Sequence, residues 1–146
     1  MTVLHSSRGG VTNALTIDVE DYFQVSALAS HFPKDVWNTT PCRVERNVER
    51  ILDMLARRGA RGTFFTLGWV AQRHPALLQR IAAQGHEIAS HGWDHARVHT
   101  LDRASFAADL EKSRKAIEDA AGVRITGYRA PSFSIDQRTP WAHEIL

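Results

Sequence analysis

Short apolar runs alternate with amphipathic segments of helical period along this chain, and this alternation restricts the fold more than any other feature. The runs are expected strands, and they cover residues 13–19 (NALTIDV), 63–66 (TFFT), 86–89 (HEIA) and 123–128 (VRITGY). Between them, apolar side chains recur every three or four positions, as on one face of a helix. Strands that alternate with such helices predict an α/β fold with a parallel sheet and right-handed crossovers.

The intervening helices carry start and stop signals. Threonine precedes two of them as an expected N-cap, and glycine follows each of them, where a left-handed backbone commonly ends a helix. We expect helices from the cap Thr40 to Gly59, from Pro75 to Gly85 and from the cap Thr100 to Gly122, and the start of a fourth over 139–146. Residues 20–40 have no clear period and are expected to form a structured, functional loop.

About four βα units make half of a (β/α) barrel, which usually needs about 250 residues. An open parallel sheet accommodates the same pattern, so the pattern alone allows both architectures. The length of 146 residues fits one domain. We therefore expect an N-terminal arm over 1–12 and a single domain over 13–146.

Composition excludes several classes of function. With 43% hydrophobic and 23% charged residues, the chain has the composition of a globular domain, and a formal charge of +2 argues against a nucleic-acid partner. The single cysteine, Cys42, excludes an internal disulfide framework. Neither an apolar run of 18 residues nor a signal-peptide stretch occurs, so we expect no membrane span and a cytoplasmic location.

Polar side chains follow the expected strands at the ends where parallel α/β folds bind ligands. They are Asp18, Glu20 and Asp21 after the first strand, His91 and His95 after the third, and Arg129 after the fourth. Three carboxylates within four residues repel one another unless a metal ion or an arginine offsets their charge. One or two neutral imidazoles with a carboxylate form an ordinary ligand set for Zn²⁺. Solvated loop acids and surface histidines are the alternative interpretation.

Histidines are numerous, with 8 in the chain, so the pair in SHGWDH needs support from its context. A site of three histidines, His91, His95 and His99, would need one helical face, and the intervening Gly92 and Asp94 are poor helix formers. We expect His86 to be structural, at the opposite end of its strand. The remaining histidines are expected to be ordinary surface or helix-end residues: His5, His31, His74 and His143.

Four ordered stretches carry a family resemblance: LTIDVEDYF (15–23), RGTFFTLGW (61–69), GHEIASHGWDH (85–95) and GYRAPSF (127–133). They resemble the NodB-homology polysaccharide deacetylases, carbohydrate esterase family 4. The form DVEDYF is most similar to the subgroup linked to exosortase-associated exopolysaccharide genes, which is related to allantoinase-like deacetylases. The resemblance implies the N-terminal half of a distorted (β/α)7 barrel and metal-dependent hydrolysis of N-acetyl groups on a sugar polymer.

The resemblance also implies residue roles. Asp18 would be the catalytic base, Arg129 the residue that orients it, and His91 and His95 ligands of a divalent metal ion, with Zn²⁺ expected. The third ligand in the family is an aspartate just after the base, where this chain has Glu20 and Asp21.

Glu20 is the preferred third ligand, because residues two apart lie on the same side of a continuing strand. Asp21 stays the alternative. Tyr22, Trp93 and Pro131 are expected to border the substrate, with a backbone N–H near Tyr22 stabilising the oxyanion. For Trp93, packing beside the site is the competing interpretation.

Family members also carry a downstream Leu-x-His stretch whose histidine protonates the leaving amine, and no such stretch occurs in these residues. We therefore expect a domain truncated at its C-terminus, with exposed barrel edges that favour self-association. Two alternatives to a deacetylase stay open. One is a catalytically incomplete remnant that binds metal or glycan without turnover, and the other is a small amide hydrolase similar to allantoinase.

Overall fold

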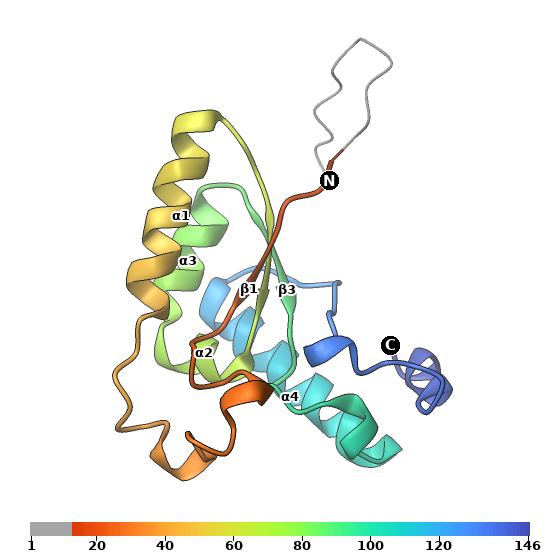
Figure 1. The fold of residues 1–146 in the computed structure, drawn as a ribbon. Coiled ribbons are helices and arrows are strands. Elements are labelled where there is room, and N and C mark those ends of the chain that lie inside the picture. Colours follow the sequence, from red (N-terminus) through yellow and green to blue (C-terminus); the bar gives the residue numbers. More distant parts are fainter. Residues whose placement is uncertain (1–12) are drawn as a thin grey trace.

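Three short parallel strands form the centre of the fold, which the computed structural model describes for residues 13–146 (Figure 1). The expected arm over 1–12, with His5, lies outside the described residues. The strands are β1 (Thr16–Val19), β2 (Thr63–Thr66) and β3 (Glu87–Ser90), in the spatial order β1-β2-β3. In this register Asp18 lies beside Phe65, and Phe65 lies beside Ala89. The sheet confirms the predicted parallel α/β class.

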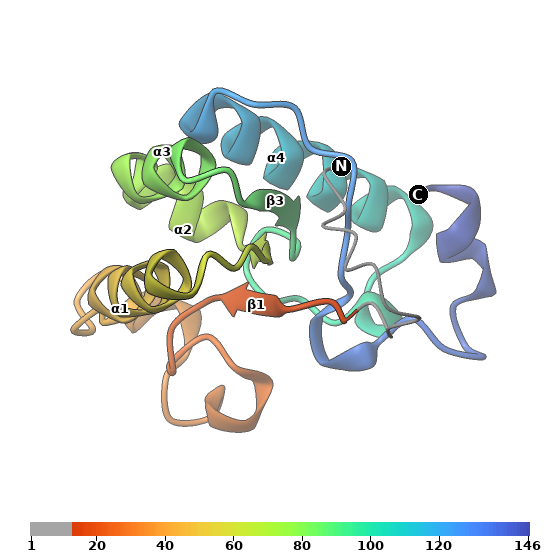
Figure 2. The same cartoon turned by 90° about the horizontal axis from the view of Figure 1, so that it is seen from above.

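Four α-helices cover one face of this sheet. They are α1 (Val44–Arg58), α2 (Gly68–Arg73), α3 (Pro75–Ala83) and α4 (Arg103–Ala121). Seen from above, they form an arc on one side of the strands (Figure 2). Short 3-10 turns lie at Ser26–Leu28, Lys34–Val36, Val98–Thr100, Pro131–Phe133 and Pro140–Glu144. The arrangement is that of a partial barrel, in which strands line the inside and helices the outside.

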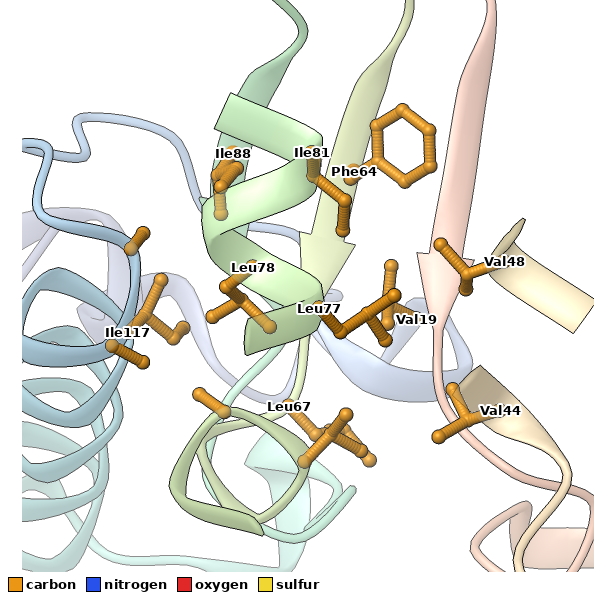
Figure 3. Close-up of a cluster of buried hydrophobic side chains, with 14 of the residues drawn as sticks. Val19, Val44, Val48, Phe64, Leu67, Leu77, Leu78, Ile81, Ile88 and Ile117 are labelled. Atoms are coloured by element: carbon orange, nitrogen blue, oxygen red, sulfur yellow. The ribbon is translucent and has the colours of Figure 1, made fainter. Parts of the chain in front are cut away.

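The core lies between the helices and the outer face of the sheet (Figure 3). Val19 and Phe64 of the strands are fully buried there, against Leu77, Leu78 and Ile81 of α3. Because side chains alternate across a strand, Thr16 and Asp18 of β1 lie on the opposite, inner face, and both are exposed. One face of the sheet thus packs an apolar core, while the other is open for polar chemistry.

The predicted fourth strand, over 123–128, is wrong. In this segment only Tyr128 joins the sheet, through one isolated parallel bridge to Ser90. Ile125 is instead buried in the core, and its amide donates to the Glu118 carboxylate of α4 at 3.0 Å. This local bond to the preceding helix holds most of the segment away from β3. Residues 13–146 thus form three βα units and a single bridge where four strands were expected.

Two of the predicted helix starts are also wrong. Thr40 does not cap α1, which begins at Val44 and takes its cap from a residue far along the chain, described below. Helix α4 is capped by Asp102, whose Oδ1 accepts the Ser105 N–H at 2.7 Å, whereas the Thr100 hydroxyl donates to the Arg97 carbonyl. The glycine stops at Gly59 and Gly122 are confirmed, both with left-handed backbone.

Two further differences concern short helices. Helix α2 was not predicted, because its six residues are too few to show a period. The predicted helix over 139–146 is only the 3-10 turn Pro140–Glu144. Within residues 13–146, no helix has the length and apolar character that crossing a membrane requires.

Candidate metal centre

Three potential metal ligands converge at the carboxyl ends of the strands. Glu20 directly follows β1, His91 directly follows β3, and His95 lies one turn of chain later. The Oε2 atom of Glu20 lies 3.2 Å from Nε2 of His95 and 3.8 Å from Nε2 of His91. All three ligand atoms lie within 4.8 Å of one another, and this is the one such group found among the described residues.

Both imidazoles present their Nε2 atoms to this cluster because their Nδ1 atoms have partners elsewhere. Nδ1 of His91 lies 2.8 Å from the backbone carbonyl oxygen of Arg129, so it carries the proton and donates it. Nδ1 of His95 lies 3.3 Å from the Ser26 hydroxyl. Burial lowers the pKa of His91 and lowers that of His95 to about 4, so both rings are neutral at pH 7. Neutral imidazoles with an oriented Nε2 lone pair suit metal coordination.

Glu20 completes the set with an oxygen that lacks a protein partner. Its Oε2 atom is buried and accepts no hydrogen bond from the described residues. Burial, reinforced by the nearby Asp18 charge, raises the pKa of Glu20 to about 7. An unsatisfied carboxylate oxygen facing two imidazole nitrogens is costly without a cation, and the three residues therefore fit a divalent metal ion.

Asp18 and Arg129 form an ion pair beside the cluster. Nη1 of Arg129 donates to Oδ1 of Asp18 at 2.5 Å, and Nη2 donates to the Thr16 hydroxyl at 2.8 Å. The guanidinium also stacks over the Phe65 ring, 3.9 Å from its centroid. The second carboxylate oxygen of Asp18 lies 4.0 Å from Nε2 of His91. The arginine thus directs one oxygen of Asp18 away from the cluster and leaves the other beside it.

Asp21 lies in a different position and has a different task. Its Oδ2 atom accepts the backbone N–H groups of Arg43 and of Val44, the latter at 2.8 Å, and therefore caps α1. Its Oδ1 atom accepts the Tyr22 N–H at 2.9 Å. The side chain is 4% exposed and is not part of the cluster. Asp21 was predicted only as an alternative ligand, and spacing alone could not show that α1 begins beside it.

The three predicted substrate residues lie around the cluster with protein partners of their own. The Tyr22 amide donates to Asp21, and its hydroxyl donates to the Pro41 carbonyl at 3.3 Å, so this amide is not free to stabilise an oxyanion. The Trp93 ring packs on Gly68 and lies under Nζ of Lys112. Pro131 is buried. The packing interpretation of Trp93 agrees with these contacts, and a substrate role for the three residues stays a prediction.

The other described histidines lie outside the cluster. Nδ1 of His86 accepts the Gly62 N–H at 3.2 Å beside the Phe64 ring, as expected for a structural residue. His99 lies 3.1 Å from a guanidinium nitrogen of Arg138 and is not the third member of a histidine site. His31 and His143 are exposed, and His74 lies 3.5 Å from Glu45.

Sequence reasoning missed Ser26 and Thr16. Each contacts a site residue through a single hydroxyl, and no spacing rule identifies such partners.

A carboxylate and two neutral imidazoles at the carboxyl edge of a parallel sheet define an α/β protein with a ligand set used by catalytic zinc hydrolases. A family model described as "Polysaccharide deacetylase" matches residues 34–145. The chain belongs to this family. Its expected membership of the NodB-homology group, carbohydrate esterase family 4, is thereby confirmed.

Curated relatives share this assignment. The peptidoglycan-N-acetylglucosamine deacetylase PgdA of Listeria monocytogenes is 31% identical over 88 residues, which are 60% of this chain and 19% of that protein. Chitin deacetylase 1 of Cryptococcus neoformans is 33% identical over 88 residues, again 60% of this chain and 19% of the relative. The chain therefore spans about a fifth of the length of these relatives.

A solved structure supports the fold. A polysaccharide deacetylase of Mycobacterium smegmatis is similar with a TM-score of 0.70 and 33% sequence identity, over 87% of this chain and 45% of that chain. The chain thus matches a little under half of that chain, as expected for a partial barrel.

Proposed function

We propose that this chain acts, by itself or as part of a longer protein, in metal-dependent hydrolysis of N-acetyl groups on a polysaccharide. The observation that carries the proposal is the cluster of Glu20, His91 and His95 beside the Asp18–Arg129 ion pair. These three residues would hold the metal ion, and Zn²⁺ is the ion that two imidazoles and one carboxylate favour. A bound Zn²⁺ supplies a Lewis acid for the acetyl carbonyl and lowers the pKa of a water molecule.

Asp18 is the proposed catalytic base. Its free oxygen lies beside the cluster, where it can accept the proton of the water that attacks the acetyl carbon. The proton that Asp18 takes then passes to the departing nitrogen as the C–N bond breaks, which releases acetate and an amine. Arg129 fixes the direction of Asp18, because the guanidinium donates to the other carboxylate oxygen.

Asp21 is assigned a structural role in this proposal, and Glu20 that of the third ligand. Three backbone groups already donate to Asp21, whereas Glu20 Oε2 has no donor among the described residues. A metal ion would therefore satisfy the unpaired Oε2 atom of Glu20, whereas the oxygens of Asp21 already accept hydrogen bonds.

The proposed substrate is a polymer that contains N-acetylglucosamine, since the similar relatives bear the names peptidoglycan and chitin deacetylase. The resemblance to exosortase-linked proteins adds an N-acetylated exopolysaccharide to the polymers worth assaying. Allantoin and related small amides test the narrower alternative of an allantoinase-like hydrolase.

A second candidate is binding of metal or glycan without turnover. It is favoured by the positions of His86 and His99, which are bonded to Gly62 and Arg138 and are not placed to protonate a leaving amine. The same assay separates the two candidates, because a binding protein retains metal but releases no acetate.

The test is acetate release from N-acetylglucosamine oligomers and from peptidoglycan by the 146-residue chain loaded with Zn²⁺ or Co²⁺. Turnover that is lost in Asp18→Asn, while bound metal per chain is unchanged, supports the proposal. Full turnover in Asp18→Asn contradicts the base assignment. Metal analysis of His91→Ala and His99→Ala tests the site itself, and only the first substitution should abolish binding.

We also propose that the chain associates with itself through the open edge of the sheet. Among the described strands, β1 pairs with β2 alone, and Leu15 next to it is 45% exposed. Unpaired strand edges with apolar neighbours favour pairing with another chain.

A further inference from the structure

The turn between the two histidines has an unusual backbone that must be held in place. Gly92 has a φ of 79°, and His95 has a φ of 62°, a left-handed value that is uncommon outside glycine. These angles set the direction in which the chain carries His95 back toward His91. A small change in the turn would therefore separate the two Nε2 atoms.

Helix α2 holds the carbonyl groups of this turn. Its first two amides, those of Gly68 and Trp69, donate to the carbonyl oxygens of Gly92 and Trp93, each at 2.9 Å. The amide of Gly92 is satisfied too, by the Ser90 hydroxyl oxygen at 3.1 Å. The Trp93 N–H remains, and its acceptor must come from another element.

That acceptor is Asp109, a residue of α4 on the outer side of the fold. Its Oδ2 and Oδ1 atoms lie 3.1 and 3.3 Å from the Trp93 nitrogen. Among the described residues, this amide is the sole hydrogen-bond donor to the carboxylate. The contact is close, because a Cβ atom on Gly92 would lie 3.0 Å from Oδ2 of Asp109.

A carboxylate at this place is costly for folding. Burial raises the pKa of Asp109 to about 6, so the charged form at pH 7 is held against a desolvation penalty. A group that only packs α4 against the sheet would be better apolar. The carboxylate of Asp109 instead accepts a backbone N–H of the turn that joins His91 to His95, so its position affects the metal site.

We propose that Asp109 is a positioning residue for the metal centre, which sets the relative placement of His91 and His95 by fixing the Trp93 amide. Among the described residues, its carboxylate has no hydrogen bond to Glu20, His91 or His95, and it acts through the Trp93 backbone. The proposal rests on the function proposed above, because it assumes that His91 and His95 bind a metal ion. Partners that orient ligands commonly contribute a factor of about 10 to 100 in metal affinity.

The test is titration of the metal-free chain with Co²⁺, followed by the visible absorption of the bound ion, which reports its coordination geometry. We expect Asp109→Ala to weaken Co²⁺ binding roughly tenfold or more and to shift the absorption bands. Asp109→Asn keeps an oxygen acceptor in the same place, so its affinity should stay within about threefold of the wild type. Asp119→Ala is the matched control, because Asp119 lies exposed on the same helix and pairs with Lys115.

Two results would overturn the role of Asp109. One is wild-type affinity and an unchanged Co²⁺ spectrum in a folded Asp109→Ala chain. The other is a loss in Asp109→Asn as large as in Asp109→Ala, which would show that the charge matters rather than the acceptor. If circular dichroism shows Asp109→Ala to be unfolded, Asp109→Leu, which fills the same place without an acceptor for the Trp93 amide, replaces it in the Co²⁺ titration. A wild-type chain that binds no Co²⁺ would instead contradict the metal centre, and so the failure of the two proposals can be told apart.

Discussion

Arg129 contacts Asp18 across the inner face of the sheet, with 2.5 Å between Nη1 and Oδ1, although the two residues are 111 positions apart. The same arginine accepts the His91 ring N–H through its backbone carbonyl at 2.8 Å. Arg129 therefore acts twice: its side chain orients the proposed base, and its main chain sets the tautomer of a proposed ligand. Substitution of Arg129 would remove the side-chain contact with Asp18 but keep the backbone contact with His91.

Arg129→Ala should consequently separate catalysis from metal binding. We expect acetate release to fall by a factor on the order of 100, because Asp18 loses the guanidinium donor that fixes its direction. Co²⁺ affinity should stay within about threefold of the wild type, since the backbone carbonyl remains. Arg114→Ala, which removes two ion pairs on the outer surface of α4, is the control. Equal losses of metal binding and of activity would show that the Arg129 side chain is not specific to catalysis.

Glu20→Gln and Asp21→Asn should differ sharply in metal content. Loss of the Glu20 carboxylate removes one of three ligands, so Zn²⁺ affinity should fall by more than about tenfold. Asp21→Asn keeps an acceptor oxygen for the N-terminus of α1 and should bind nearly as much metal as the wild type. Equilibrium dialysis with metal analysis measures both. Metal lost only from the Asp21 variant would reverse the ligand assignment.

Asp21→Ala should destabilise the fold. Its carboxylate accepts two amides at the start of α1 and one from Tyr22, and charged caps of this kind contribute about 2 kcal/mol. Urea unfolding followed by circular dichroism measures the loss. Asp102→Ala, which removes the exposed local cap of α4, should destabilise the fold less. A smaller loss for Asp21→Ala than for Asp102→Ala would show that the long-range cap is weak.

The stability of the chain should depend on pH through Asp109. Its pKa is about 6 in the folded chain, above the ordinary value of 3.8, so the folded state binds more protons between these values. The free energy of unfolding therefore falls as the pH rises from about 4 to 6. We expect Asp109→Asn to raise that free energy by about 2 kcal/mol at pH 7 and to change it little at pH 4. An equal effect of Asp109→Asn on the free energy of unfolding at both pH values would contradict the raised pKa of Asp109.

Self-association should be visible in sedimentation equilibrium as an average mass that rises with concentration. Leu15→Lys places a charge beside the open edge of β1 and should lower this mass toward that of the monomer. Met54→Lys is the matched control, since Met54 is 48% exposed on α1, among the helices that cover the other side of the sheet. A monomer at all concentrations would exclude association through this edge.

The class of fold could be predicted from the sequence because its signals are local. The apolar run over 63–66 became β2 at those positions, and Gly59 and Gly122 end α1 and α4 with left-handed backbone, as expected. The run over 123–128 shows the limit of such signals. Its residues suit a strand, but the bond between Ile125 and Glu118 and the burial of Ile125 keep it out of the sheet.

The residues of the candidate site could be predicted from the sequence, but the role of each residue could not. Asp18, Glu20, His91, His95 and Arg129 were all expected at one edge of the sheet, and the structure brings them together. Local spacing favoured Glu20 over Asp21 as the third ligand, but it could not show that Asp21 caps α1, because that depends on where α1 begins in space. Nor could it indicate Asp109, whose contact with the Trp93 amide joins α4 to the turn between the histidines.

The sequence by itself determined the parallel α/β class, the glycine stops of α1 and α4 and the set of polar residues at the strand ends, since each follows from period and backbone preference over a few residues. The tertiary structure alone decided which carboxylate faces the imidazoles, which nitrogen of each imidazole is free and which residue holds the turn between them. Those outcomes depend on hydrogen bonds between residues 16 to 69 positions apart, which form only when the packed core brings their elements into contact.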